Sequence, residues 1–225
     1  MSLVNELDFN AEEFHFFNHR YLNSFVDKIY ASRISDERLL TDILDIPCVH
    51  HTAGLAGDIK DEKYFDWSNH EYLLQAFKDE FKVHVSRIYR KNVMDISFVN
   101  PANAGVKLDF EQYIWVNRQK ATEYNPLHNH TGLLSFVYYP DIPDEIREEY
   151  KQQTNNYEAR GLIEFVASRE TDSMVFNPRR GELFMFDAGH RHQVYPFYSD
   201  ATRVSLAGNI YGILFDDASI LGKFV

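Results

Sequence analysis

The hydrophobic positions of the first ninety residues recur mostly at steps of three or four, which is typical of amphipathic helices. The pattern covers residues 10–32 and 36–45 and a third segment that follows Ser68. In the third segment Ser68 and Glu71 have the spacing of a capping box, in which each side chain satisfies a backbone N–H of the first helical turn. We therefore predict three helices in this part of the chain, the last one capped by Ser68.

After Asn92 the hydrophobic period shortens from 3.6 to two, which is typical of strands buried on one face. Leu108, Phe110, Ile114 and Val116 alternate with more polar residues. Further strand-like segments are separated by proline and glycine, and they cover residues 133–139, 162–167, 174–176, 182–186, 193–197 and 203–211. Only residues 144–153 resemble a short helix within this series.

This order of elements predicts a mainly β, α+β fold. Short strands without alternating helices favour an antiparallel jelly roll, or double-stranded β-helix, of the cupin-like kind. We expect one domain over residues 1–225, with a helical part at 1–92 packed on one sheet of a β core at 93–225. The candidate chemistry described below lies in the β core.

Charge and composition narrow the classes of partner. The 225 residues include 23 basic and 34 acidic side chains, so the formal net charge of −11 argues against a surface that binds nucleic acid phosphates. The single cysteine, Cys48, cannot form an intramolecular disulfide. No apolar run approaches the length of a membrane span, and the acidic N-terminus differs from a signal peptide. We therefore expect a cytoplasmic protein without a membrane or nucleic acid as its primary partner.

Histidine pairs in the second half are candidate metal ligands. His128 and His130 precede the strand-like segment 133–139, and residues i and i+2 of an extended backbone point to the same side. Such a pair can give two ligands to one metal, although a surface pair or a hydrogen-bonded structural pair would have the same spacing. About sixty residues later, His190 and His192 follow Gly189, and either of them can supply a third ligand from a distant strand.

An arginine in a strand is a candidate anion ligand. Arg203, Ser205, Ala207 and Asn209 share one face of the segment 203–211, and a charged arginine on a buried face needs an anionic partner. An internal salt bridge with Glu182 or Asp187 is one possibility. A small carboxylate ligand held by Arg203 and Ser205 is the other.

Taken together, these motifs resemble the Fe(II)- and 2-oxoglutarate-dependent dioxygenases, in particular the group with a paired His-x-His. The resemblance covers residues of about 110 to 212. Its motifs are Trp-x-Asn at Trp115 and Asn117, Asn-x-x-His-x-His at 125–130, Leu-Ser-x-Val-Tyr-Tyr at 134–139, His-x-Val-x-Pro at 192–196 and Arg-x-Ser-x-Ala-x-Asn at 203–209.

The resemblance implies an iron site made by two histidines and a carboxylate, with His128 as the first ligand and His192 as the distal one. The carboxylate usually stands two residues after the first histidine, where this chain has His130. Three arrangements follow: His130 is the third ligand; His130 is itself the first ligand and Gly132 leaves the carboxylate position vacant; or Asp187 supplies an oxygen. We favour a metal site of His128, His130 and His192.

The same resemblance implies roles for the neighbouring residues. Arg203 would bind the distal carboxylate of 2-oxoglutarate, and Ser205 and Tyr139 would donate hydroxyl hydrogen bonds to it. Four further residues could orient the substrate or co-substrate, or have structural roles only, and they are Trp115, Asn117, His190 and Asn209. No side chain need act as a nucleophile or general base.

The implied reaction is hydroxylation of a small-molecule or peptide substrate by O2, with decarboxylation of 2-oxoglutarate to succinate and CO2. Two alternatives remain. A cupin-like three-histidine protein could act as a dioxygenase or isomerase without a keto acid, and a non-catalytic jelly roll could use its histidines for structure alone. The substrate and the oligomeric state stay open.

Overall fold

The structure is a computed structural model that describes residues 4–5, 15–18, 28–50, 56–101, 114–152, 159–166 and 173–222. Its helices are α1 (Glu37–Leu40), the 3-10 helix η2 (Asp42–Asp45), α2 (Glu71–Tyr89) and α3 (Asp144–Lys151). Its strands before the jelly roll are β1 (Val4–Asn5), β2 (His15–Asn18), β3 (Lys28–Arg33), β4 (Cys48–His50), β5 (Glu62–Phe65) and β6 (Val93–Ser97). The later strands are β7 (Ile114–Gln119), β8 (Asn125–His128), β9 (Leu134–Asp141), β10 (Ile163–Val166), β11 (Ser173–Phe176), β12 (Glu182–Asp187), β13 (His192–Val194), β14 (Arg203–Ile210), β15 (Gly212–Phe215) and β16 (Ile220–Gly222).

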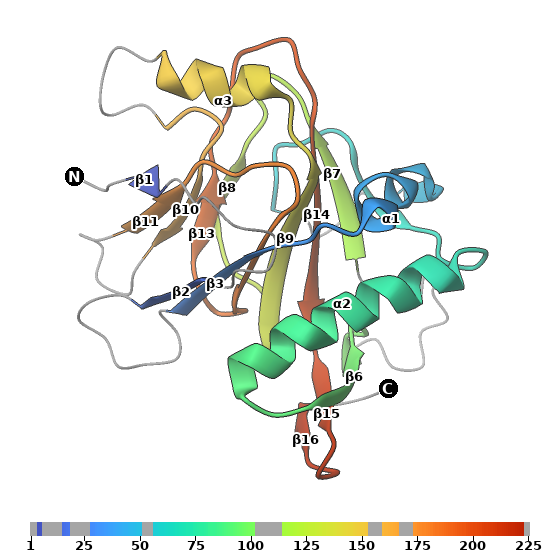
Figure 1. Cartoon of the computed structure of the whole chain (residues 1–225). Coiled ribbons are helices and arrows are strands. Elements are labelled where there is room, and N and C mark those ends of the chain that lie inside the picture. Colours follow the sequence, from blue (N-terminus) through green and yellow to red (C-terminus); the bar gives the residue numbers. More distant parts are fainter. Residues whose placement is uncertain are drawn as a thin grey trace.

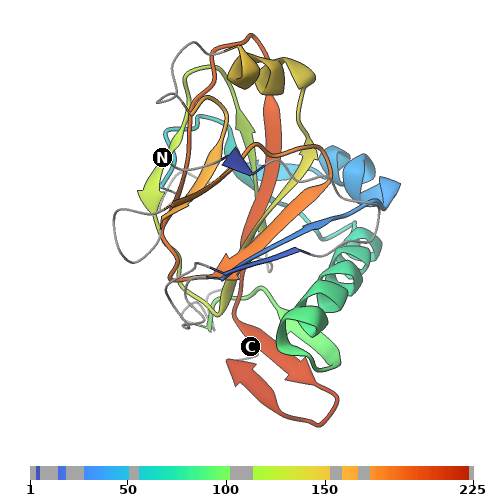
Figure 2. The same ribbon diagram turned by 60° about the vertical axis from the view of Figure 1, so that its left-hand side comes forward.

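Two sheets form the centre of the molecule (Figures 1 and 2). The major sheet has the order β2-β3-β12-β9-β14-β7-β5-β4, and the minor sheet has the order β1-β11-β10-β13-β8. From β7 to β14 the chain passes repeatedly between them, so that β12-β9-β14-β7 of one sheet face β11-β10-β13-β8 of the other. This connectivity is that of a double-stranded β-helix, and the predicted jelly roll is confirmed.

Helix α2 covers the outer face of the major sheet (Figure 1). Its Phe77 and Phe81 stack at 4.2 Å between ring centroids, and Phe81 meets the edge of Phe136 of β9 at 4.5 Å. Phe98 packs on all three rings at 5.8 to 6.0 Å. Burial of each such ring contributes roughly 1.5 to 3 kcal/mol, so this aromatic cluster fixes the helix on the sheet.

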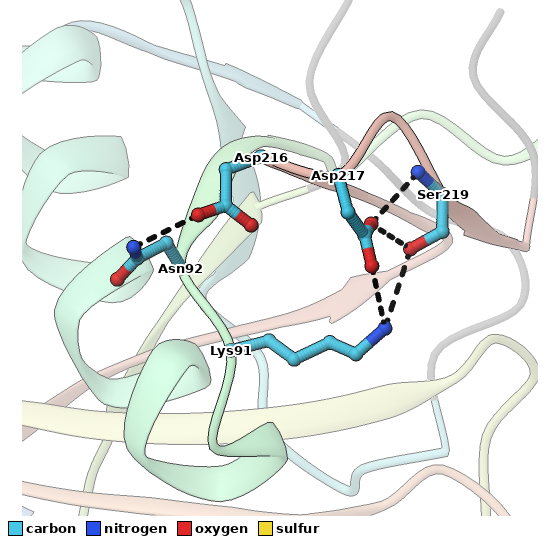
Figure 3. Close-up of polar contacts among 5 residues, drawn as sticks. All are labelled: Lys91, Asn92, Asp216, Asp217 and Ser219. Carbon is cyan, nitrogen blue, oxygen red and sulfur yellow. Dashed lines mark hydrogen bonds and ion pairs between the residues drawn. The ribbon is translucent and has the colours of Figure 1, made fainter.

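Polar contacts join the end of α2 to the turn between β15 and β16 (Figure 3). Nζ of Lys91 lies 3.0 Å from Oδ2 of Asp217, and Nδ2 of Asn92 donates to Oδ2 of Asp216 at 2.9 Å. The backbone N–H of Ser219 donates to Oδ1 of Asp217 at 2.9 Å and shapes the turn. Because these groups are exposed, their contribution to stability is modest, and they mainly set the position of the hairpin.

Most of the predicted β elements are confirmed. The six strand-like segments between residues 133 and 211 correspond to β9 to β14, and the two shorter helices correspond to α1 with η2 and to α3. Leu108 and Phe110 lie outside the described residues. None of the helices in the described part of the chain is both long and apolar enough to span a membrane.

Two predictions in the first ninety residues are wrong. Within the segment 10–32, the residues that the structure describes are the strands β2 and β3, not a helix. β3 is buried on both faces, since Tyr30 packs under the helices while Ile29 and Ala31 face the minor sheet. A strand that is buried on both faces lacks the alternation of apolar and polar residues by which strands are predicted. The predicted capping box is also absent, because the hydroxyl of Ser68 donates to Asp66 and α2 begins at Glu71.

Candidate metal centre and anion pocket

A pocket of about 740 Å³, part of it open to solvent, lies between the two sheets. Side chains of β7, β9 and β14 form one wall, and those of β8, β10 and β13 form the other. Apolar residues close much of it, and they include Val137, Ile163, Phe186 and Val194. A polar set stands among them: three histidines, Arg203, Ser205, Tyr139 and Asn117. The inner face of the jelly roll therefore combines an apolar wall with a few convergent polar groups, as ligand pockets do.

Strand pairing brings the three histidines together. His128 ends β8 and His192 begins β13, and the two residues stand directly opposite each other in the register. His130 follows two residues later, where its backbone N–H donates to the carbonyl of Ala188 at 2.8 Å. One ring nitrogen from each of the three histidines lies within 4.8 Å of the others. This spacing suits three imidazoles around a single metal ion.

Hydrogen bonds orient two of the three imidazoles. Nδ1 of His128 lies 2.6 Å from the carbonyl oxygen of Pro126, and Nδ1 of His192 lies 3.1 Å from that of His190. Since a carbonyl only accepts, each Nδ1 carries the proton and each Nε2 keeps its lone pair for a metal.

Burial keeps the rings neutral. It lowers the pKa of His128 and, with the neighbouring histidines, places that of His192 well below its usual range. Burial, together with the nearby imidazole of His128, lowers the pKa of His130 to about 3. Neutral imidazoles are the form that binds metal, so these residues fit a divalent iron ion.

The structure places the other candidate ligands elsewhere. Among the described residues no carboxylate joins the histidine cluster. Oδ1 of Asp187 instead accepts the backbone N–H of Gly189 at 2.8 Å, in the turn that leads to β13. His190 is buried against the edge of Phe165 at 5.9 Å, and it acts on the cluster through its carbonyl oxygen. The first of the three expected arrangements, with all three histidines as ligands, stays a prediction that the clustering of their ring nitrogens supports.

Arg203 is a buried cation without a buried counter-ion. Only 1% of its surface is exposed, and its guanidinium donates to the carbonyl of Gly161 and to the side-chain oxygen of Gln119. No carboxylate of the described residues pairs with it. Glu182 accepts the backbone N–H of Arg179 instead, and burial lowers the pKa of Arg203. A buried charge that is hydrogen-bonded only to neutral groups favours the binding of an anion.

Hydroxyl and amide groups extend the polar end of the pocket around Arg203. Ser205 stands opposite Asn117 in the sheet, and its Oγ accepts from Nδ2 of Asn117 at 3.4 Å. The hydroxyl of Tyr139 and Oδ1 of Asn117 are buried without a hydrogen-bond partner in the described residues. Burial raises the pKa of Tyr139 to about 12, so the hydroxyl keeps its proton and can donate. Each unpaired buried group costs about 1 to 3 kcal/mol, and a ligand can supply the missing partners.

The histidine cluster and Arg203 lie in a segment that matches a known protein family. Residues 113–209, which contain the histidine cluster and Arg203, match the family described as "Putative 2OG-Fe(II) oxygenase". The resemblance to the 2OG-Fe(II) oxygenases is confirmed. No curated protein matches the chain.

Solved structures with a similar fold include three oxygenases. A 2OG-Fe(II) oxygenase family oxidoreductase from Burkholderia pseudomallei is 16% identical over 85% of this chain and 72% of its own, with a TM-score of 0.44. A Pseudomonas putida prolyl-4-hydroxylase is 14% identical over 77% and 81%, with a TM-score of 0.42. A Trichoplax adhaerens prolyl hydroxylase, in complex with a hypoxia inducible factor peptide fragment, is 13% identical over 91% and 84%, with a TM-score of 0.44.

Two further predicted residues within the matched segment 113–209 differ in their surroundings. Trp115 lines the pocket, and its ring lies 5.7 Å from that of His130. Asn209 is absent from the pocket lining, because its Oδ1 accepts from the hydroxyl of Ser135 at 2.6 Å and ties β14 to β9. A shared strand face therefore does not ensure a shared role.

One ionisable pocket residue lies outside residues 113–209 and was not predicted from the sequence. Glu62 of β5 lines the pocket and is only 8% exposed. Burial and the nearby Glu123 raise the pKa of Glu62 to about 7. Its position depends on the pairing of β5 with β7, and the short segment Glu62–Phe65 carries no local signal that would predict this pairing.

Proposed function

We propose that this protein is an Fe(II)- and 2-oxoglutarate-dependent oxygenase that hydroxylates a small-molecule or peptide substrate and converts 2-oxoglutarate to succinate and CO2. The observation that carries the proposal is the buried Arg203. It has no carboxylate partner in the described residues and lines the same pocket as the three histidines. An arginine in that position needs a small anion beside a metal, and 2-oxoglutarate is such an anion.

Six polar residues of the pocket have a part in this function. His128, His130 and His192 would hold iron, which supplies the activation of O2 when it is bound. Arg203 binds the distal carboxylate of 2-oxoglutarate with two N–H groups, while the hydroxyls of Tyr139 and Ser205 donate to the same ligand. The apolar wall of Val137, Ile163, Phe186 and Val194 excludes water from the reacting groups.

The three-histidine cluster favours one alternative, a metalloprotein that acts without a keto acid. Cupin-like sites of three histidines need no anion beside the metal, so that alternative leaves Arg203 without a ligand. The two functions therefore differ in whether 2-oxoglutarate binds.

An anaerobic titration distinguishes them. Addition of Fe(II) and then 2-oxoglutarate should produce a weak visible metal-to-ligand charge-transfer band, and 2-oxoglutarate should raise the melting temperature of the iron-loaded protein. Iron binding without the band or the thermal shift would reject the proposal in favour of the three-histidine alternative. Absence of iron binding would reject both.

A further inference from the structure

The carboxyl group of Glu62 has no part in the functions assigned above, although it lies in the same pocket. β5 holds it beside β7, where Glu62 stands opposite Asn117 in the register. The hydrogen bonds of Arg203 go to Gly161 and Gln119, so the pocket has an anion-binding end that does not involve Glu62. Glu62 is therefore free to contact a second ligand.

Acceptor oxygens gather around Glu62. The backbone of Gly57 packs so closely here that a Cβ atom on it would lie 2.7 Å from Oε1 of Glu62 and 3.0 Å from Oδ1 of Asn125. Oδ1 of Asn125 and Oδ1 of Asn117 are both buried without a partner in the described residues. Two amide oxygens thus lack donors beside the carboxyl group of Glu62, and a group that pairs with all three side chains must bring N–H or O–H bonds.

Two acidic side chains lie at this end of the pocket. Glu123 lies close enough to raise the pKa of Glu62, and its own carboxyl accepts the backbone N–H of Lys120 at 2.9 Å. Lys63, the neighbour of Glu62 in the chain, pairs with Asp61 at 2.9 Å. No lysine or arginine of the described residues forms an ion pair with Glu62. A buried acid without a cation destabilises the free protein, and a cationic ligand would remove that cost.

We propose, building on the oxygenase function, that Glu62 and the amide oxygens of Asn117 and Asn125 bind an ammonium or guanidinium group of the substrate. Arg203 and Glu62 then sort the two ligands by charge, because the anionic co-substrate is attracted to the first and repelled by the second. The substrate class is an amine or guanidine, either free or as the side chain of a peptide.

Calorimetry on the Zn(II)-loaded protein with 2-oxoglutarate tests this without turnover. The probes are matched pairs that differ mainly in charge: arginine and citrulline, lysine and norleucine, and blocked tripeptides with a central arginine or citrulline. We expect the cationic member of at least one pair to bind roughly 10- to 100-fold tighter, because a charged hydrogen bond is lost in the neutral one. The free and blocked probes distinguish a free amine from a peptide side chain.

Variants assign the preference to Glu62. Glu62→Gln should abolish the preference for the cationic probe, and Glu62→Asp should restore part of it. Glu145→Gln, which removes an exposed carboxylate on α3, should leave the preference unchanged. Equal binding of charged and neutral probes to the wild-type protein, or a preference that survives in Glu62→Gln, would overturn the proposal.

Thermal unfolding separates this role from a structural one. Since an amide is easier to bury than an unpaired acid, Glu62→Gln should melt at the wild-type temperature or above it. A melting temperature clearly below that of Glu145→Gln would show that Glu62 supports the fold, and the proposal would then be wrong.

The binding measurements distinguish failure of the cation site from failure of the oxygenase function. If 2-oxoglutarate fails to bind while the binding of arginine or lysine depends on Glu62, the cation site stands and the oxygenase function fails. If 2-oxoglutarate binds and no cationic probe is preferred, only the cation site is rejected.

Discussion

Two adjacent tyrosines of β9 show how the two faces of the major sheet differ. Tyr138 points outward, and its hydroxyl donates to the carbonyl of Leu39 in α1 at 2.9 Å. Tyr139 points inward, where its hydroxyl is buried and no described residue accepts from it. The two side chains are equally buried, at 0% and 1% exposed. They differ only in whether the hydroxyl has a hydrogen-bond partner.

Buried polar groups follow the same division. Ser32 and His84 lie 3.1 Å apart between β3 and α2, and the other ring nitrogen of His84 reaches Glu80 at 3.2 Å. On the inner face, Arg203 and Glu62 have no charged partner in the described residues. These two outer-face groups are thus paired within the protein, whereas Arg203 and Glu62 would gain charged partners only from ligands. Unpaired buried groups that converge in one pocket mark a candidate functional surface more clearly than burial alone.

The largest effect is expected from the loss of a metal ligand on the inner face. His192→Ala should weaken Fe(II) binding by at least roughly 100-fold, because two imidazoles remain. His190→Gln should retain the metal, since it keeps the carbonyl that orients His192. Anaerobic calorimetry with Fe(II) measures both. Tight binding by His192→Ala would remove this residue from the site.

Substitutions on the outer face should change the free energy of unfolding but not the affinity for Fe(II). Phe81→Ala removes a ring stacked on Phe77 and edge-on to Phe136, and it should lower the free energy of unfolding by about 3 to 5 kcal/mol. Urea unfolding gives the value, and Phe81→Leu should lose less. The folded fraction of either variant should bind Fe(II) as the wild type does. A large change in its metal affinity would contradict the separation of the two faces.

Substitution of Arg203, at the anion-binding end of the pocket, should change the affinity for 2-oxoglutarate. Arg203→Met removes a charged, bidentate contact worth about 1.5 to 3 kcal/mol, so 2-oxoglutarate should bind roughly 10- to 100-fold more weakly. Arg180→Met removes the same charge from an exposed position and should have little effect. Titration of the charge-transfer band measures the affinity. An equal loss of iron in Arg203→Met would contradict the assigned role.

The two tyrosines offer the smallest and most direct test. Tyr138→Phe should cost about 1 kcal/mol of stability, because the carbonyl of Leu39 loses its donor. Tyr139→Phe should cost none in the absence of 2-oxoglutarate and should weaken its binding several-fold. Urea unfolding of the two variants side by side gives the comparison. Equal destabilisation would mean that the hydroxyl of Tyr139 has a partner within the protein.

The sequence predicts the jelly roll well because its strands have one buried face and end at prolines or glycines. The resemblance to the oxygenases also points to His128, His130, His192 and Arg203, which lie in one pocket, whereas strand spacing alone does not choose between His190 and His192. Prediction from the sequence fails at β3, where burial on both faces hides the period. It leaves open the role of Asn209, whose side chain accepts a hydrogen bond from Ser135. It also misses Glu62, whose place in the pocket depends on the pairing of β5 with β7, more than fifty residues apart in the chain.

The position of β5 has a consequence for substrate choice. The segment that matches the oxygenase family begins at residue 113, so Glu62 and Gly57 stand outside it. Under the proposed roles, the acidic group of the substrate site therefore lies outside the matched segment, while its two amide groups, Asn117 and Asn125, lie within it. A substitution at Glu62 would then change the charge preference for the substrate and leave the proposed metal and co-substrate residues in place.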